Sequence, residues 1–158
     1  MKYKSSQTGW IVMSLLLGVL VLLTLSVYKP WGNNPIPLTP YLIIAGVFIL
    51  LILLFYRMTL EIDYPRMKIQ YGIGLIRFTF CLDHLQRVEI IHTPWYYGLG
   101  IRITPKGMLY NIQGSGAVRI FYQKNGKNKS FMVGTPNPEE LKEVLDRIHE
   151  LLIIKNTS

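Results

Sequence analysis

The fold is decided by two uncharged stretches, Trp10–Val27 (WIVMSLLLGVLVLLTLSV) and Tyr41–Tyr56 (YLIIAGVFILLILLFY). At a rise of about 1.5 Å per residue, a helix over either stretch crosses most of a hydrocarbon core about 30 Å thick. Neither stretch has a polar face, and a helix that is apolar all round is buried in a large protein or spans a membrane. A chain of 158 residues cannot enclose two such helices, so we expect a transmembrane hairpin in residues 1–57.

A cleaved signal peptide is the main alternative for the first stretch. Signal peptides have an apolar core of about 7–15 residues that ends at a small-residue cleavage site. The first stretch is longer than that, and the SVYKP sequence at residues 26–30 makes a poor cleavage site. The second apolar stretch also follows closely, as in a helical hairpin. We therefore expect the first segment to remain in the protein.

The basic residues beside the two stretches predict how the hairpin is oriented. The connecting loop, residues 29–40, contains Lys29 as its one charged residue. Lysine and arginine favour the cytoplasmic side of a membrane. We therefore expect a multi-pass protein of the cell membrane with both termini and the soluble domain in the cytoplasm. The basic residues on that side of the spans are Lys2, Lys4, Arg57, Arg66 and Lys68.

The net charge of +8 argues less for nucleic-acid binding than its size suggests. Residues 1–57 contain no acidic residue and account for half of this excess. No basic helix and no stripe of alternating basic and aromatic residues appears, so a nucleic-acid partner is not expected. The basic residues near the spans instead suit an anionic membrane surface.

The polar residues form no familiar catalytic or metal-binding pattern. His84, His92 and His149 lack the spacing of metal ligands, and no Ser-His-Asp or Cys-His arrangement is evident. Cys81 is the one cysteine and lies in the apolar run RFTFCL, so we expect it to fill a core. The sequence therefore predicts no metal, no cofactor and no enzymatic activity.

From Met58 onward, apolar and polar residues alternate in short runs separated by turn residues, which is typical of β-strands. Asn125-Gly126 is a strong signal for a two-residue hairpin loop. Strands this short and evenly spaced predict an antiparallel barrel or sandwich of about seven strands. The expected strands cover residues 58–64, 67–71, 75–80, 85–92, 100–104, 108–112, 117–122 and 129–133.

Helical spacing returns near the C-terminal end. Asn137 is suited to the N-cap position and Pro138 to the first helical position, and two glutamates follow. We predict a helix over about 138–153 that docks on the strands, which gives an α+β soluble domain in residues 58–158. The apolar side chains expected on its docking face are Leu141, Val144, Leu145, Ile148, Leu151 and Leu152.

This succession of strands and a C-terminal amphipathic helix resembles the pleckstrin-homology (PH) fold. Residues 95–111 (WYYGLGIRITPKGMLYN) and 133–141 (VGTPNPEEL) are similar to bacterial membrane-anchored PH-like proteins in particular. The resemblance covers about residues 58–152 and implies a PH-like domain beside one or two transmembrane helices, with protein or peptide binding as the general role. Phosphoinositide-binding members of the wider fold carry a K-x(n)-[KR]-x-R pattern at the first hairpin, which the DYPRMK sequence at residues 63–68 lacks.

Three groups of residues are candidates for a partner or lipid surface. An aromatic run in an irregular segment would expose area typical of binding surfaces, or else would cover the barrel end or contact headgroups. Two arginines on strands are expected to point outward, toward solvent or toward a carboxylate or phosphate. Three lysines form a basic hairpin tip that serves solubility or binds an acidic lipid or partner. These groups are Trp95, Tyr96 and Tyr97; Arg102 and Arg119; and Lys124, Lys127 and Lys129.

The sequence as a whole predicts a membrane-tethered, non-enzymatic interaction or scaffold module on the cytoplasmic face, accessory to a membrane complex and bound to a protein partner there. One alternative is a regulator that senses anionic lipid headgroups through the basic hairpin. Another is a membrane enzyme whose catalytic residues follow no familiar pattern.

Overall fold

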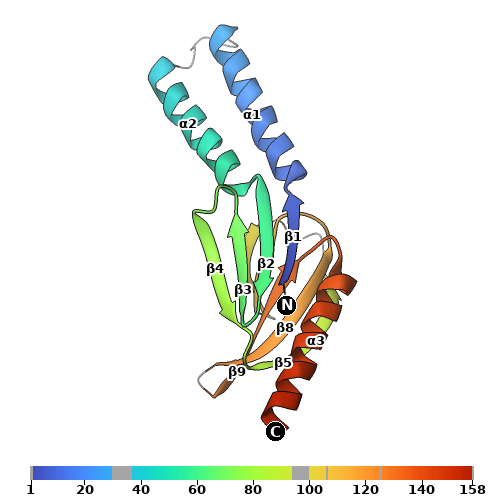
Figure 1. Cartoon of the computed structure of the whole chain (residues 1–158). Helices are drawn as coiled ribbons and strands as arrows, with labels where there is room; N and C mark the ends of the chain where they lie inside the picture. Colours follow the sequence, from blue (N-terminus) through green and yellow to red (C-terminus); the bar gives the residue numbers. More distant parts are fainter. Residues whose placement is uncertain (1, 30–36, 94–99, 106, 125, 158) are drawn as a thin grey trace.

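The structure is a computed structural model that describes residues 2–29, 37–93, 100–105, 107–124 and 126–157. Two helices, α1 (Trp10–Tyr28) and α2 (Leu38–Phe55), extend together from one end of a β-rich domain (Figure 1). Both helices are long and apolar enough to cross a membrane, as the sequence predicts. They are linked by a hydrogen bond between Thr24 Oγ1 and the hydroxyl of Tyr41, which lie 3.0 Å apart.

The first sheet is antiparallel and has the strand order β1-β2-β3-β4. Its strands are β1 (Lys2–Thr8), β2 (Arg57–Asp63), β3 (Arg66–Tyr71) and β4 (Ile76–Cys81). The sequence pattern predicts no strand before the first apolar stretch, yet β1 pairs with β2 along its whole length. This sheet is therefore built from both sides of the helical pair, and residues 58–158 alone do not complete it.

The second sheet has the strand order β5-β8-β9-β7-β6. The expectation of a wholly antiparallel domain is wrong at one place, because β7 and β9 run parallel where Met108 faces Phe131. All eight strands expected after the helices are present, with ends shifted by at most two residues, and β1 brings the described strands to nine rather than about seven. The strands of this sheet are β5 (Leu85–His92), β6 (Gly100–Thr104), β7 (Gly107–Asn111), β8 (Gly116–Lys124) and β9 (Lys127–Gly134).

The C-terminal helix, α3 (Pro138–Thr157), packs on β5 and β8. Leu141, Leu145 and Ile148 are fully buried against the sheets, which confirms most of the predicted docking face. Leu151 is an exception, because it is 58 % exposed. His149 fixes the helix further through a 3.0 Å hydrogen bond between its Nδ1 and the Leu85 carbonyl oxygen.

The main core lies between the two sheets and α3. At its centre, the buried Tyr71 hydroxyl donates a hydrogen bond to the Asn111 carbonyl oxygen, 3.4 Å away. Burial raises the pKa of Tyr71, so its phenol stays protonated and remains a donor. Cys81 does not fill this core, contrary to expectation. It is exposed at the end of β4 and donates to Asp83 Oδ2 at 2.9 Å, because strand alternation turns residue 81 outward while Leu82 is buried.

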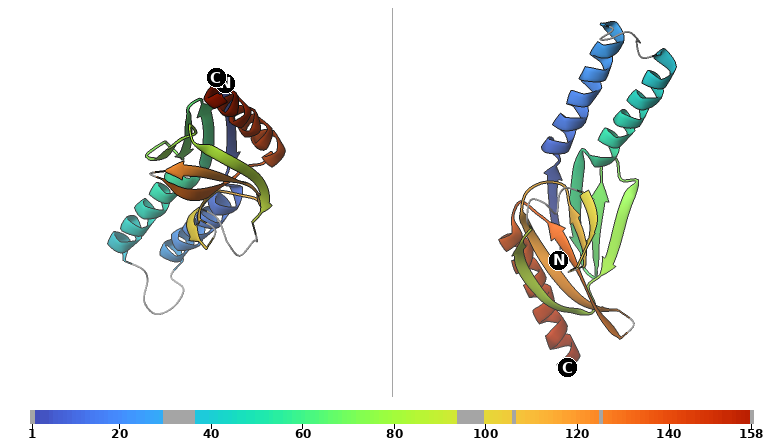
Figure 2. Two further views of the ribbon diagram at one scale, coloured as in Figure 1. Left: turned by 90° about the horizontal axis from the view of Figure 1, so that it is seen from below. Right: turned by 180° about the vertical axis from the view of Figure 1, so that it is seen from behind.

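The helical pair is joined to the β domain by very short connections. Gly9 and Tyr56 are the single residues between helix and strand, and the Gly9 amide donates to the Tyr56 carbonyl oxygen at 2.9 Å. The turn between β3 and β4 also contacts α2, because the Ile73 amide donates to the Leu53 carbonyl oxygen at 3.2 Å. The views in Figure 2 show the consequence: the helices leave one end of the domain, and the chain ends at the other. We call the end away from the helices the distal end.

Candidate functional site

The distal half of the β domain carries a groove of about 480 Å³, which we call the distal groove. It opens beside the first residue of β7, Gly107. The two strands pair over Met108–Tyr110 of β7, and the first residues of β9, 127–130, extend past this pairing toward the distal end. Strands far apart in the sequence therefore contribute to one concave surface. Its lining residues are Phe80, Ile103, Pro105, Gly107, Met108, Tyr110, Arg119, Tyr122, Lys129, Ser130 and Phe131.

The floor of the distal groove is a cluster of aromatic rings. Phe131 stacks on Phe80, with ring centroids 3.9 Å apart and planes at 12°. Tyr122 and Tyr110 meet Phe131 edge-on, with centroids at 5.6 and 6.2 Å. Phe131 is 2 % exposed and Tyr110 is 4 % exposed, whereas Tyr122 and Phe80 are half-buried and reach the groove surface. Such a floor offers apolar area with fixed ring positions, which suits recognition of apolar side chains.

The cations among the described lining residues of the groove are Arg119 and Lys129, both named as candidates from the sequence. The Arg119 guanidinium lies 4.5 Å from the ring centroid of Phe121 and donates to Ser130 Oγ from Nε (3.3 Å) and Nη2 (3.1 Å). Within the described residues, neither cation pairs with a carboxylate. Glu89 faces Arg119 across the β5–β8 ladder, but its carboxylate pairs with Arg87 at 2.6 Å instead.

Among the described lining residues, the groove therefore combines an aromatic floor with two positive charges and no acidic side chain. Hydrogen bonds orient Arg119 and leave the remaining guanidinium donors for a ligand. This arrangement fits a carboxylate next to an apolar side chain. Its described lining residues include no His, Asp, Glu or Cys.

The other predicted site residues lie elsewhere. Lys124 and Lys127 face each other across the tip of the β8–β9 hairpin, where both are exposed. The hairpin itself was predicted and is present, and Gly126 has the positive φ of 72° that such a turn requires. Arg102 is exposed on β6 beside Val12 and Phe55, close to the helices and away from the groove. Trp95, Tyr96 and Tyr97 lie outside the described residues.

The position of the hairpin tip matters for the lipid alternative. The β8–β9 hairpin ends at the distal end of the domain, opposite α1 and α2 (Figure 1). A strand of seven residues such as β2 is about 23 Å long, so the tip stands well away from the helix ends.

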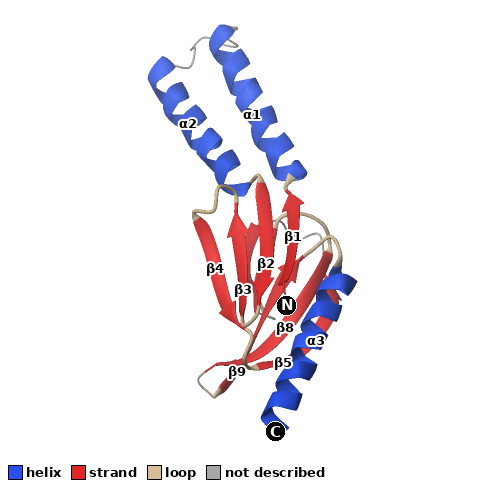
Figure 3. Ribbon diagram, in the orientation of Figure 1, coloured by secondary structure: helices blue, strands red, loops and turns tan. Residues whose placement is uncertain are grey.

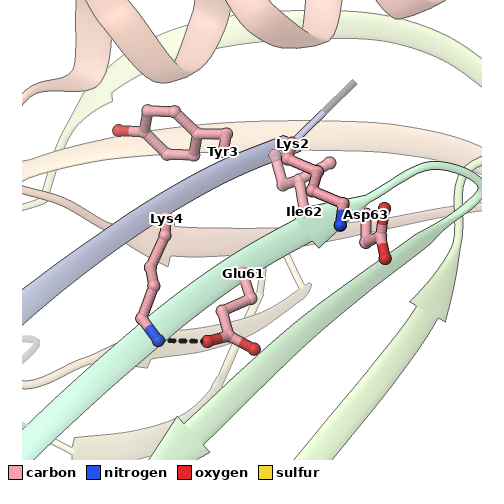
Figure 4. A pocket seen from close by; sticks show the side chains of 6 residues that line it. All are labelled: Lys2, Tyr3, Lys4, Glu61, Ile62 and Asp63. Atoms are coloured by element: carbon pink, nitrogen blue, oxygen red, sulfur yellow. Dashed lines mark ion pairs between the residues drawn. The ribbon is translucent and has the colours of Figure 1, made fainter.

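A smaller hollow of about 320 Å³ lies at the β1–β2 edge, lined by charged residues of both strands (Figure 4). Lys4 Nζ lies 2.6 Å from Glu61 Oε1, and this hydrogen bond lowers the pKa of the Glu61 carboxyl. Lys2 faces Asp63 in the same register. The positive side chains of β1 therefore lie opposite negative side chains of β2. We infer that these charge pairs hold β1 in register, and we do not assign a ligand to this hollow.

Two further observations complete the description of the site. No three His, Cys, Asp or Glu side chains in that part of the chain gather to form a metal site. Comparison of the chain with known protein families, with curated proteins and with solved structures found no match. The distal groove and the helical pair are the features of the described residues that bear on function.

Proposed function

We propose that this chain is a membrane-tethered, non-enzymatic interaction module, with α1 and α2 in the cell membrane and the β domain in the cytoplasm. The length and composition of the helices support the tether. The Lys and Arg residues on one side of the spans support the cytoplasmic placement. We further propose that the domain is PH-like, because two packed sheets followed by a C-terminal helix match the layout that the sequence resemblance implies.

The distal groove is the observation that carries this proposal. Its aromatic floor and its two cations without carboxylate partners fit a protein segment that presents an acidic side chain next to an apolar one. A buried aromatic pocket with an arginine is the usual composition of a strong contact point between proteins. The groove lies in the half of the domain away from the helices, within reach of a segment of a membrane partner that extends into the cytoplasm.

The test is site-specific photo-cross-linking of the full-length protein in its native membrane. The cross-linker replaces Ile103, which is 86 % exposed at the rim of the groove. A matched position is Lys68, exposed on β3 and outside the groove lining. We expect a discrete protein adduct from position 103 and none from position 68.

The charges of the groove supply the second part of this test. Arg119→Gln with Lys129→Gln should reduce the adduct at position 103 by about fivefold or more, because a hydrogen bond to a charged group contributes roughly 1.5–3 kcal/mol. Equal adducts at positions 103 and 68, or an adduct unchanged by the double substitution, would contradict the proposal.

The lipid-sensing alternative rests on the exposed lysines of the hairpin tip. Since the tip is at the distal end, it would contact a second membrane or vesicle and not the leaflet that holds the helices. The test holds the full-length protein in a nanodisc and adds vesicles of phosphatidylcholine with phosphatidylserine. Capture of these vesicles that is lost in Lys124→Gln with Lys127→Gln, which leaves Lys129 in the groove, would favour the alternative.

A further inference from the structure

The turn between β3 and β4, residues 72–75, presents two large apolar side chains to the outside of the protein. Ile73 is 54 % exposed and Leu75 is 70 % exposed. A single exposed apolar side chain needs no explanation on a protein surface. Two of them lie in one tight turn next to the end of an apolar helix, and this arrangement favours contact with an apolar environment outside the protein.

The hydrogen bonds of the turn fix its depth relative to α2. The Ile73 amide donates to the Leu53 carbonyl oxygen at 3.2 Å, and Leu53 lies in the last turn of the helix. Two residues separate Leu53 from the helix end at Phe55, which is about 3 Å along the axis. The backbone of Ile73 is therefore level with the last turn of α2. Figure 3 shows the turn lying beside that end of the helix.

The length of α2 then indicates how deep in a bilayer the backbone of Ile73 would lie. Its 18 residues span about 27 Å, close to the hydrocarbon thickness of about 30 Å. If α2 crosses the membrane, its last turn lies at the boundary between acyl chains and headgroups. A side chain that leaves the protein at this level meets the lipid interface and not bulk water.

The contact between turn and helix is also rigid. The Gly72 amide donates to the Arg57 carbonyl oxygen at 2.6 Å, and Gly72 has a φ of +53°. A Cβ atom at this position would lie 2.1 Å from the Leu53 carbonyl oxygen, so glycine is needed for the close approach. The turn cannot move away from α2 without breaking the hydrogen bond between Ile73 and Leu53, and the bond from Gly72 to Arg57 also holds it to the first residue of β2.

Two exposed arginines flank the apolar side chains. Arg77 donates from Nε to the Gly74 carbonyl oxygen within the turn, and Arg57 donates to Ser6 Oγ at 2.9 Å just beyond the helix end. Each guanidinium retains further donors, and arginine at the level of the headgroups binds lipid phosphates. Apolar tips at the acyl boundary with arginines on the aqueous side are the arrangement of an interfacial anchor.

We infer that the β3–β4 turn is a second membrane contact, in which Ile73 and Leu75 insert into the lipid interface beside α2 while Arg57 and Arg77 meet the phosphates. This inference rests on the proposed membrane insertion of α2. The contact adds a third attachment point to the two helix–strand connections. It restricts tilting of the β domain on the membrane and keeps the distal end, where the groove lies, away from the bilayer.

The test measures how deeply the turn lies in phosphatidylcholine proteoliposomes of the full-length protein. In a Cys81→Ser background, an environment-sensitive fluorophore is attached to Ile73→Cys or Leu75→Cys, and quenching by lipids spin-labelled near the headgroup is compared with quenching by lipids labelled near the bilayer centre. Two control positions accompany these. Tyr64→Cys lies in the turn at the other end of β3 and is 37 % exposed in the native chain, and Val47→Cys lies within α2 and is 50 % exposed.

We expect headgroup-level quenching of about twofold or more at positions 73 and 75 and none at position 64, since a strand of six residues places position 64 about 20 Å further from the membrane. Position 47 should be quenched best by the central label. Quenching at 47 with none at 73 or 75 would overturn the inference and leave the membrane tether intact. No quenching at 47 would overturn the tether and the inference together. A fluorescence shift at 73 that fades as the protein is diluted in lipid, without quenching, would assign the turn to contact with a second copy and also overturn the inference.

Discussion

Truncation of Leu145 tests whether α3 is part of the domain core. Leu145 is fully buried, lies at the middle of α3 and belongs to the same cluster as Leu141, Ile148 and the inner faces of both sheets. Leu145→Ala removes buried methyl groups from a site where the neighbouring strands are fixed by their own ladders and cannot close the space. We therefore expect both the lost burial and the cavity to destabilise the domain.

The expected loss of stability follows from the complete burial of Leu145. A buried leucine truncated to alanine costs about 2–5 kcal/mol, a large part of the roughly 5–15 kcal/mol that stabilises a small domain. For a domain near 100 residues, each kcal/mol lowers the melting temperature by roughly 4–8 °C. Even the lower bound therefore predicts a decrease of about 8 °C.

The chain contains its own matched control. Leu151 lies on the same helix and is 58 % exposed, so Leu151→Ala makes the same chemical change with a much smaller loss of burial than Leu145→Ala. Lys142→Ala tests the polar face, where Lys142 pairs with Asp146, and exposed pairs of this spacing contribute about 0.3–0.5 kcal/mol.

The assay is thermal unfolding of the full-length protein in nanodiscs, followed by near-ultraviolet circular dichroism. The full-length chain is required because β1 precedes the helices and completes the first sheet. Equal melting temperatures for Leu145→Ala and Leu151→Ala would refute the reasoning, since they would mean that α3 does not stabilise the sheets.

The remaining predictions concern the membrane and the first strand. The protein should resist extraction by alkaline carbonate and require detergent, and release by carbonate would contradict the transmembrane hairpin. In a Cys81→Ser background, Asn33→Cys should react with an impermeant thiol reagent in intact cells and Lys127→Cys after permeabilisation, whereas external labelling of Lys127→Cys would reverse the proposed topology. Deletion of β1 should lower the melting temperature of the β domain, because β2 loses its ladder partner along its whole length. Glu61→Gln should be less stable than the native chain at pH 7, and thermal unfolding at decreasing pH should show this difference shrink below pH 4.5. The Lys4 hydrogen bond lowers the pKa of Glu61 in the folded state, so its contribution is present above the ordinary pKa of 4.5 and is lost as pH falls through the lower folded value.

The sequence by itself determined most of the secondary structure. The two apolar stretches became α1 and α2, since a helix without a polar face is recognisable from composition alone. Period-two alternation located the eight strands after the helices, and the Asn125-Gly126 pair located the β8–β9 hairpin. Leu141, Leu145 and Ile148 were identified as docking residues because helical spacing puts them on one face.

Part of the candidate site was also found in the sequence. Arg119 and Lys129 were named there, but their position in one groove depends on the parallel pairing of β7 with β9, which joins segments that are not neighbours in the chain. The aromatic floor was missed, because Phe80, Tyr122 and Phe131 each read as ordinary core positions of separate strands. No local sequence pattern predicts which side chains of separate strands will come together at the surface of a groove.

Only the tertiary structure decided three other features, and each depends on a distant neighbour. The segment Lys2–Thr8 is polar and carries no strand pattern, and it becomes β1 because the free edge of β2 pairs with it. Cys81 and Leu151 have the residue types of a core, yet both are exposed. Strand alternation turns Cys81 outward, and Leu151 lies beside the face of α3 that Leu145, Ile148 and Leu152 bury. The β3–β4 turn has a sequence like any exposed turn, and its place beside α2 follows from a hydrogen bond to Leu53, which lies 20 residues earlier. Periodicity reports which face of an element is apolar, whereas pairing across long stretches of chain decides what that face, edge or turn will meet.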